Sequence, residues 1–137
     1  MRQAPCRTAL IVAAICFVSD GFLHQKVVNE QWEAVVAALG ASFKEHADWT
    51  MVYFVVFEMG RGFLTMYVYV LLRPRLGPSA TTATWAGVVA WVAYSLTGPV
   101  QFIPLGFYSE GLWISVAAYQ LVAAIIAAIA GAAPYKE

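Results

Sequence analysis

Charged residues inside long apolar segments constrain this chain more than any other feature of its sequence. Asp20, Glu58 and Arg61 each lie within an apolar stretch of the length, about 20 residues, that crosses a bilayer core. A charge at membrane depth is costly unless it has a partner. The sequence therefore predicts an integral membrane protein in which a polar cluster lies between helices.

Composition supports the same class. Of 137 residues, 61% are hydrophobic and only 12% are charged, a balance outside the range of soluble domains. The chain is too short for a helix bundle plus a separate soluble domain, so we expect residues 1–137 to form a single transmembrane domain within the lipid bilayer. The formal net charge is zero, and the sequence has no basic patch of the kind that nucleic acid requires. We therefore expect no nucleic-acid binding.

Four segments are predicted to span the membrane as helices, at about residues 8–28, 49–72, 82–101 and 111–133. The first begins like a secretory signal, but no small-x-small cleavage site follows it, so we expect it to remain as a span. Pro74 disfavours helix at the preceding Arg73 and is expected to end the second span. The predicted fold class is all-α, an integral membrane four-helix bundle.

Residues 30–44 are predicted to form a short amphipathic helix between spans 1 and 2. Apolar residues recur there at helical offsets, while charged residues occupy the other side. We expect this helix to lie at the membrane interface, with Gly40 as its weak point; the alternative is a water-exposed extension of span 1. The apolar stripe consists of Trp32, Val35, Val36, Leu39 and Phe43.

The distribution of basic residues predicts that both termini are cytoplasmic. Basic residues precede span 1, occupy the short loop between spans 2 and 3 and end the chain, whereas the other loops are mainly acidic. Basic loops tend to stay on the cytoplasmic side, so we expect a multi-pass protein of the bacterial inner membrane. The residues that carry this prediction are Arg2, Arg7, Arg73, Arg75 and Lys136.

Polar residues of different spans are predicted to meet at one depth. Counting ~1.5 Å per residue along each helix brings Asp20 and Glu58 to the same level and Arg61 close to the midplane. An unpaired arginine is strongly disfavoured there, so we expect Arg61 to contact Asp20 or Glu58. The predicted cluster, with its neighbours in depth, consists of Asp20, His24, Glu58, Arg61, Gln120 and Tyr94.

This predicted cluster has two interpretations. In the first, its ion pairs and hydrogen bonds hold the helices in register, because polar groups connect helices within membranes. In the second, two carboxylates around one arginine leave a surplus acid that takes up a proton or a cationic ligand. The second interpretation makes the protein a small proton-coupled or ligand-binding transporter.

His24 is the candidate ligand for a cofactor. An intramembrane histidine can hold a haem, a pigment or a metal ion, but haem usually has a second axial ligand. The other histidine, His46, lies in a hydrophilic loop, and the sequence contains no metal-binding or catalytic motif. We therefore expect no cofactor, no metal site and no catalytic residue, with His24 as a single haem, pigment or metal ligand left as the alternative.

The last span carries two series of small residues at intervals of four. Small residues let helix backbones approach closely, which is how helices associate within lipid. We expect one series to pack inside the bundle and the other to meet a second copy, another membrane chain, or a bound lipid or pigment. This predicts a non-enzymatic accessory or structural subunit. The two series are Ala123, Ala127 and Gly131, and Ala124, Ala128 and Ala132.

The segment Asp20-Gly-Phe-Leu-His24, the four spans and the small-residue last helix resemble small four-span inner-membrane proteins of bacteria that have no assigned activity. The resemblance implies a bundle with cytoplasmic termini and implies no chemistry. Small multidrug exporters also have four spans, but their acid lies in the first span without an arginine beside it. Here Glu58 and Arg61 lie together in the second span, which weakens the analogy with exporters.

Overall fold

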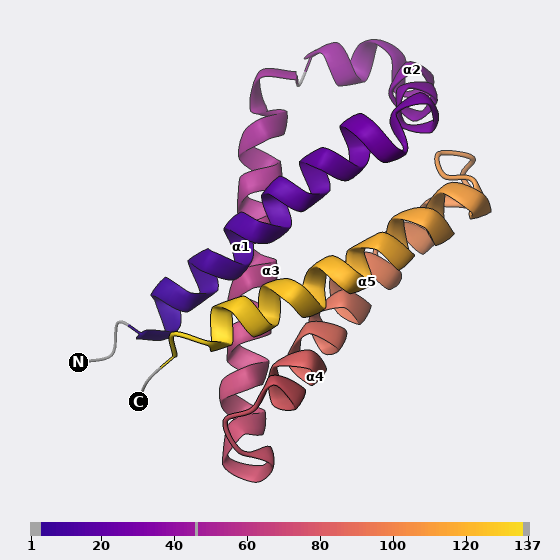
Figure 1. Ribbon diagram of the computed structural model, residues 1–137. Coiled ribbons are helices and arrows are strands. Elements are labelled where there is room, and N and C mark those ends of the chain that lie inside the picture. The colour runs from indigo at the N-terminus through magenta and orange to yellow at the C-terminus, as the bar shows by residue number, and fades with distance from the viewer. Residues whose placement is uncertain (1–3, 46, 136–137) are drawn as a thin grey trace.

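The computed structural model describes residues 4–45 and 47–135, and this part of the chain is predominantly helical, without a strand. Side chains are described for the same residues except 4, 5, 39, 41–45, 47 and 48. The elements are α1 (Ala4–Phe22), the π-helix η1 (Leu23–Val27), α2 (Asn29–Glu45), α3 (Ala47–Leu76), α4 (Ala80–Trp91), the π-helix η2 (Val92–Leu96), the 3₁₀-helix η3 (Pro99–Phe102) and α5 (Glu110–Ala132). Figure 1 labels the five α-helices. The predicted all-α class is confirmed.

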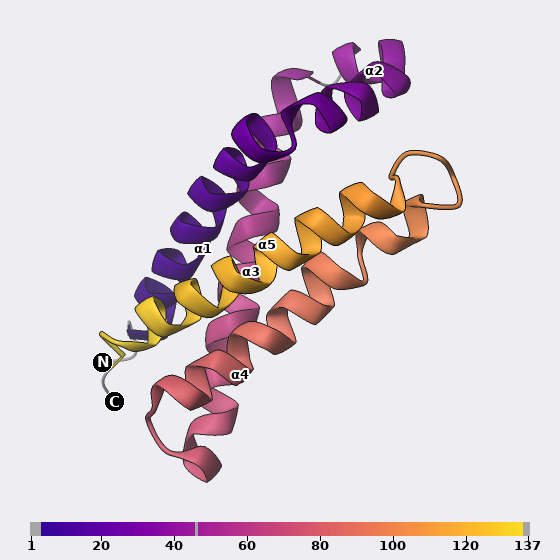
Figure 2. The same cartoon turned by 45° about the vertical axis from the view of Figure 1, so that its right-hand side comes forward.

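Four helices, α1, α3, α4 and α5, pack in a ring. α1 contacts α3 and α5, and α4 contacts the same two helices; Figure 2 shows α4 running along α5. The beginning of α1 and the end of α5 lie together at one end of the molecule, which we call the terminal end. The opposite end carries α2 and the loop before α5, and we call it the α2 end.

Three helices are long and apolar enough to cross a membrane, within the described residues: Cys6–Val27, Trp49–Leu76 and Glu110–Ala132. The third predicted span, 82–101, is less regular than expected. Here a 12-residue α-helix passes into the five-residue η2 and then, after Thr97, into η3. Pro99 contributes no backbone N–H, and the Thr97 hydroxyl donates to the carbonyls of Val92 and Ala93, so regular α-helix ends early.

α3 extends further than the sequence predicts. The expected end at Leu72 is wrong, because the helix continues through Arg73 and Pro74 to Leu76. A proline in the last turn removes one backbone hydrogen bond rather than interrupting a long helix. The Gly77 N–H, donating to the Arg73 carbonyl at 2.9 Å, closes the turn that follows.

α2 matches the predicted amphipathic helix and bends at Gly40, whose φ is 58°. Its Trp32 and Val35 side chains pack against the chain's own apolar cluster at the α2 end, formed by Leu23, Val28, Leu112 and Val116. The first part of the stripe therefore has a partner within the chain. The side chains of Leu39 and Phe43 lie outside the described residues.

Small residues permit the closest helix crossings. A Cβ on Gly62 would contact the Ala9 carbonyl oxygen and lie 2.9 Å from the Ala13 nitrogen, so α3 and α1 touch backbone to backbone. A Cβ on Gly87 would lie 2.8 Å from the Ala124 carbonyl oxygen, which brings α4 equally close to α5.

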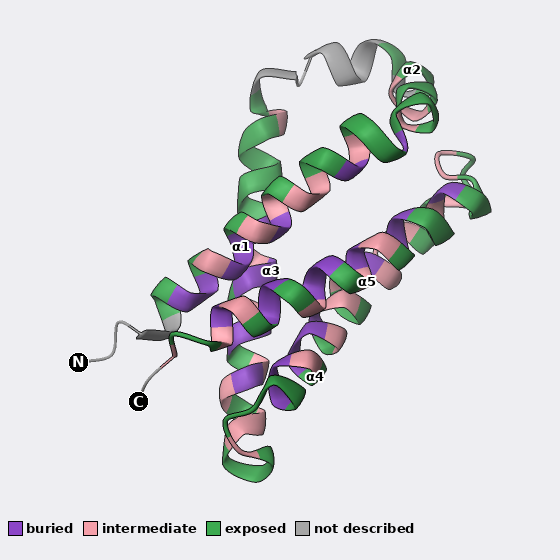
Figure 3. Cartoon of the chain, viewed as in Figure 1, coloured by how far each residue is buried: buried purple, intermediate pink, exposed green. Residues whose placement is uncertain are grey.

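Both small-residue series of α5 pack against other helices of the same chain. Ala123, Ala124, Ala127, Ala128 and Gly131 are all buried (Figure 3). Gly131 meets Val12 and the Thr8 carbonyl of α1, whereas Ala124 and Ala128 meet Gly87 of α4. The expectation of a spare small-residue face for a partner is wrong, because the ring places α5 between two helices and each covers one series.

Candidate functional site

The centre of the ring holds a buried ion-pair cluster, which we call the buried charge cluster: Asp20, Glu58, Arg61 and Gln120. Arg61 is 0% exposed and its NH1 group lies 3.1 Å from Asp20 Oδ2 and 3.4 Å from Glu58 Oε1. The contact predicted for Arg61 is therefore present, and it involves both acids. Glu58 and Arg61 share one face of α3, since they are three residues apart.

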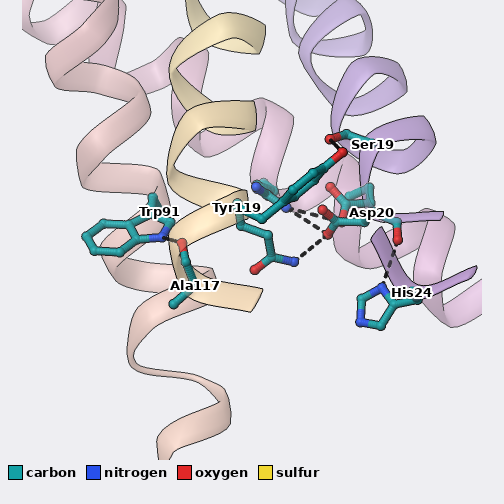
Figure 4. A network of polar contacts seen from close by, with 9 residues as sticks. Ser19, Asp20, His24, Trp91, Ala117 and Tyr119 are labelled. Carbon is teal, nitrogen blue, oxygen red and sulfur yellow. Dashed lines mark hydrogen bonds and ion pairs between the residues drawn. The ribbon is translucent and has the colours of Figure 1, made fainter. Parts of the chain in front are cut away.

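Gln120 joins α5 to the same acid. Its Nε2 donates to Asp20 Oδ2 at 2.7 Å, so one carboxylate oxygen accepts hydrogen bonds from two helices (Figure 4). Cys16 lies one turn before Asp20 and is buried, within electrostatic range of Arg61, Glu58 and Asp20. Three helices thus meet at one polar centre.

Several atoms of the buried charge cluster lack a hydrogen-bond partner among the described residues. They are Asp20 Oδ1, Glu58 Oε2, Arg61 Nε and Arg61 NH2. Buried polar groups nearly always have a partner, and each one without a partner destabilises the fold by about 1–3 kcal/mol. The cluster therefore carries more hydrogen-bonding capacity than its own four residues use.

His24 lies beside the buried charge cluster, but among the described residues its ring makes no hydrogen bond to a side chain of the cluster. Within the cluster it contacts only the backbone of Asp20. Its Nδ1 is 2.8 Å from the Asp20 carbonyl oxygen, one helical turn back. Its ring packs edge-on against Trp32, with centroids 4.4 Å apart. His24 therefore helps to hold α2 against the end of α1. His46 lies outside the described residues. No group of three or more metal-ligating side chains occurs in the described part of the chain.

Tyr94 is near the predicted depth but makes no hydrogen bond to the buried charge cluster within the described residues. Its hydroxyl lies against Gly60, 2.8 Å from where a Cβ would be, and its ring packs on Phe57 at 5.0 Å. The neighbouring Ser95 is buried, and its hydroxyl has no partner among the described residues. The sequence predicts that Tyr94 belongs to the cluster, but this residue only packs beside the cluster, against Gly60 and Phe57.

The sequence did not reveal three polar links between helical elements, one of which lies beside the cluster. Ser19 Oγ donates to the Tyr119 hydroxyl at 3.3 Å, next to the Asp20–Gln120 pair (Figure 4). The indole of Trp91 donates to the Ala117 carbonyl at 2.8 Å, and that of Trp113 to the Leu96 carbonyl at 3.1 Å. A signal for the first link was available, because Ser19 and Tyr119 each precede a residue of the cluster.

Two π-helices follow α1 and α4 toward the α2 end. η1 begins three residues after Asp20, and η2 contains Tyr94 and Ser95. Single π-turns inside helices are rare and frequently occur at functional sites. Toward this end Tyr108 packs on Trp32, and burial, with Asp20 as a smaller contributor, raises the pKa of its phenol above the ordinary value.

Two cavities of about 260 Å³ each lie away from the buried charge cluster. One is at the terminal end, between Tyr69, Ser79 and Tyr135. The other is at the α2 end, between Gln31, Val35 and Phe107. Neither is lined by a residue of the cluster, and Glu58 is only 4% exposed. Neither of these two cavities therefore leads to the cluster.

No protein-family model, curated protein sequence or solved structure matches the chain.

Proposed function

We propose that this protein is a non-enzymatic, four-span subunit of the bacterial inner membrane that associates with copies of itself, with both termini cytoplasmic. Three helices of suitable length and apolarity support insertion. α4 with η2 is the proposed additional span. The beginning of α1 and the end of α5 lie at the same end of the molecule (Figure 1), which is what an even number of crossings requires.

One stretch of α3 carries the proposal of self-association. Residues 51–57 are all exposed, from 41% at Val55 to 67% at Tyr53. Seven successive residues cover nearly two turns at ~3.6 residues per turn, so this stretch buries no face within the chain. By contrast, the stretch 116–128 of α5 buries one side.

The exposed stretch 51–57 contains no charged residue and includes Tyr53, Phe54 and Phe57. A second copy offers the same surface, so pairing needs no complementary charge. Within lipid, van der Waals packing drives helix association, and large aromatic rings supply much contact area. The buried charge cluster then has the structural role of fixing helix register.

A transporter is the second candidate, and the unpartnered atoms of the buried charge cluster favour it. A surplus acid with free hydrogen-bonding capacity suits a proton or cation site. Against it, Glu58 and Arg61 are almost fully covered, and transport requires access from each side in turn. The burial of Glu58 and Arg61 therefore favours the structural subunit.

Disulfide cross-linking tests the self-association. Val56→Cys, at 61% exposure on α3, is compared with Val122→Cys, at 58% on α5, both with the exposed Cys6 changed to Ser. We expect a cross-linked dimer from Val56→Cys and little from Val122→Cys after mild oxidation in membranes. Equal yields from both positions, or none from either, would contradict self-association through α3.

A further inference from the structure

The buried charge cluster contains two acids and one base, enclosed by apolar helices. Arg61 keeps its positive charge in proteins, so a single carboxylate balances it. If both Asp20 and Glu58 were ionised, the centre would carry a net negative charge, and no other cation pairs with these acids within the described residues. An uncompensated buried charge is strongly disfavoured. The cluster therefore needs one further positive charge to be neutral.

The geometry distinguishes the two acids. Asp20 Oδ2 accepts both the Arg61 NH1 donor at 3.1 Å and the Gln120 Nε2 donor at 2.7 Å. Such hydrogen bonds stabilise the ionised form of a carboxyl group. Glu58 has a single longer contact of 3.4 Å from Arg61, and its Oε2 has no partner among the described residues. Its side chain is also less exposed, at 6% against 14% for Asp20.

We propose that the buried charge cluster is a proton-binding site and that Glu58 holds the proton. An O–H bond forms on the Glu58 carboxyl group with a proton taken from water, and release of the proton to water restores the carboxylate. Asp20 remains the ionised partner of Arg61. A metal cation fits less well, because the guanidinium of Arg61 lies between the two acids and repels it.

The other groups around Glu58 leave this assignment unchanged. On α1 these are Asp20 and the buried thiol of Cys16. On α3 the charged neighbour is Arg61, and on η2 the Tyr94 hydroxyl packs beside Gly60. α5 contributes the neutral Gln120 and, next to it, Tyr119. Thiols and phenols carry no charge at neutral pH under ordinary conditions, so Asp20, Glu58 and Arg61 set the charge balance.

Infrared spectroscopy of the whole protein in lipid nanodiscs at neutral pH tests the assignment without a variant. Exposed acids are ionised at this pH, so a carboxylic acid C=O band reports a buried protonated acid. We expect such a band to shift when the protein is made with ¹³C-carboxyl glutamate and to stay in place with ¹³C-carboxyl aspartate. Glu58→Gln should abolish the band, because the amide replaces the acid.

Three outcomes would overturn the proposal: no acid band at neutral pH, a band that shifts only with labelled aspartate, or a band that survives Glu58→Gln. Arg61→Gln provides the opposite control. Without the guanidinium both acids bind protons, and we expect the band to grow about twofold. The proton proposal does not depend on self-association, because the infrared spectrum reports Glu58 in a single chain as well as in an oligomer. The cross-linking test, in turn, says nothing about the proton, so the two proposals can fail separately.

Discussion

The guanidinium of Arg61 on α3 donates to the Asp20 carboxylate on α1 at 3.1 Å, with no measurable exposure of the arginine. This bond joins two helices whose residues are 41 positions apart in the chain. Because Gln120 donates to the same carboxylate oxygen, the contact also fixes α5. The register of three helices therefore depends on one acid.

Loss of the arginine is expected to be worse than loss of the whole pair. Arg61→Met should destabilise the fold by about 3–5 kcal/mol, because it leaves a buried acid without a counter-charge. The double variant Arg61→Met with Asp20→Leu should recover at least half of this loss. Thermal unfolding in mild detergent, followed by tryptophan fluorescence, measures both. Arg75→Met, at an exposed position, is the control. A double variant less stable than the single one would show that Asp20 is not the essential partner.

Gln120 offers a second test of the same centre. Gln120→Leu removes the 2.7 Å donor to Asp20 and should destabilise the fold by about 1–3 kcal/mol, since a buried carboxylate loses a hydrogen bond. Gln101→Leu, at an exposed position, should leave the unfolding temperature unchanged. Equal effects at both positions would mean that the contact contributes nothing specific.

The sequence predicts well the depth at which the cluster residues lie, but it predicts poorly the direction in which each side chain points around its helix axis. A fixed rise per residue places Asp20, Glu58, Arg61 and Gln120 at one level, and the structure brings them together. Depth does not give the direction around a helix axis. Tyr94 lies within the π-helix η2, which changes that direction, so its ring turns to Phe57 and Gly60.

The small residues of α5 show the same limit. Their spacing predicts close helix contact, which the structure contains, but it does not say which helices provide it. That depends on the ring order of α1, α3, α4 and α5, which no local pattern encodes. The exposure of residues 51–57 likewise follows from the divergence of α3 from its neighbours at the α2 end (Figure 3).

Close crossings at glycine predict a selective sensitivity to alanine. Gly62→Ala should destabilise the fold by about 1–3 kcal/mol through overpacking, because its Cβ would meet the backbone of α1. Gly21→Ala has no atom within 4 Å of the new Cβ and should be neutral or slightly stabilising, since alanine favours helix. Unfolding temperatures that fall equally for both would contradict the close crossing.

Ala127→Leu tests whether the small residues of α5 act within the chain. Ala127 is 0% exposed, so the larger side chain should lower the unfolding temperature even of the monomeric protein. Ala118→Leu, on the exposed side of α5, should have no such effect. If Ala127→Leu changed only the oligomeric state and not the unfolding temperature, the intrachain packing would be wrong.

Orientation is tested by labelling introduced cysteines in intact bacteria, in a chain with Cys6 changed to Ser, where the remaining Cys16 is buried. Pro78→Cys lies in the basic loop before α4, and Leu105→Cys lies in the loop before α5 and is 65% exposed. A membrane-impermeant maleimide should label Leu105→Cys and not Pro78→Cys, because the basic loop is expected to be cytoplasmic. The reverse pattern would invert the orientation.

Native mass measurement of the protein released from nanodiscs tests the proposed self-association most directly. The single chain has a mass of 14.9 kDa. We predict that the wild-type protein has a mass that is two or more times this value. The double variant Tyr53→Ala with Val56→Ala, at positions 67% and 61% exposed, should shift the mass toward that of the single chain while the unfolding temperature changes little. A wild-type protein that runs as a single chain at all concentrations, indistinguishable from the variant, would contradict the proposal that this chain is a self-associating membrane subunit.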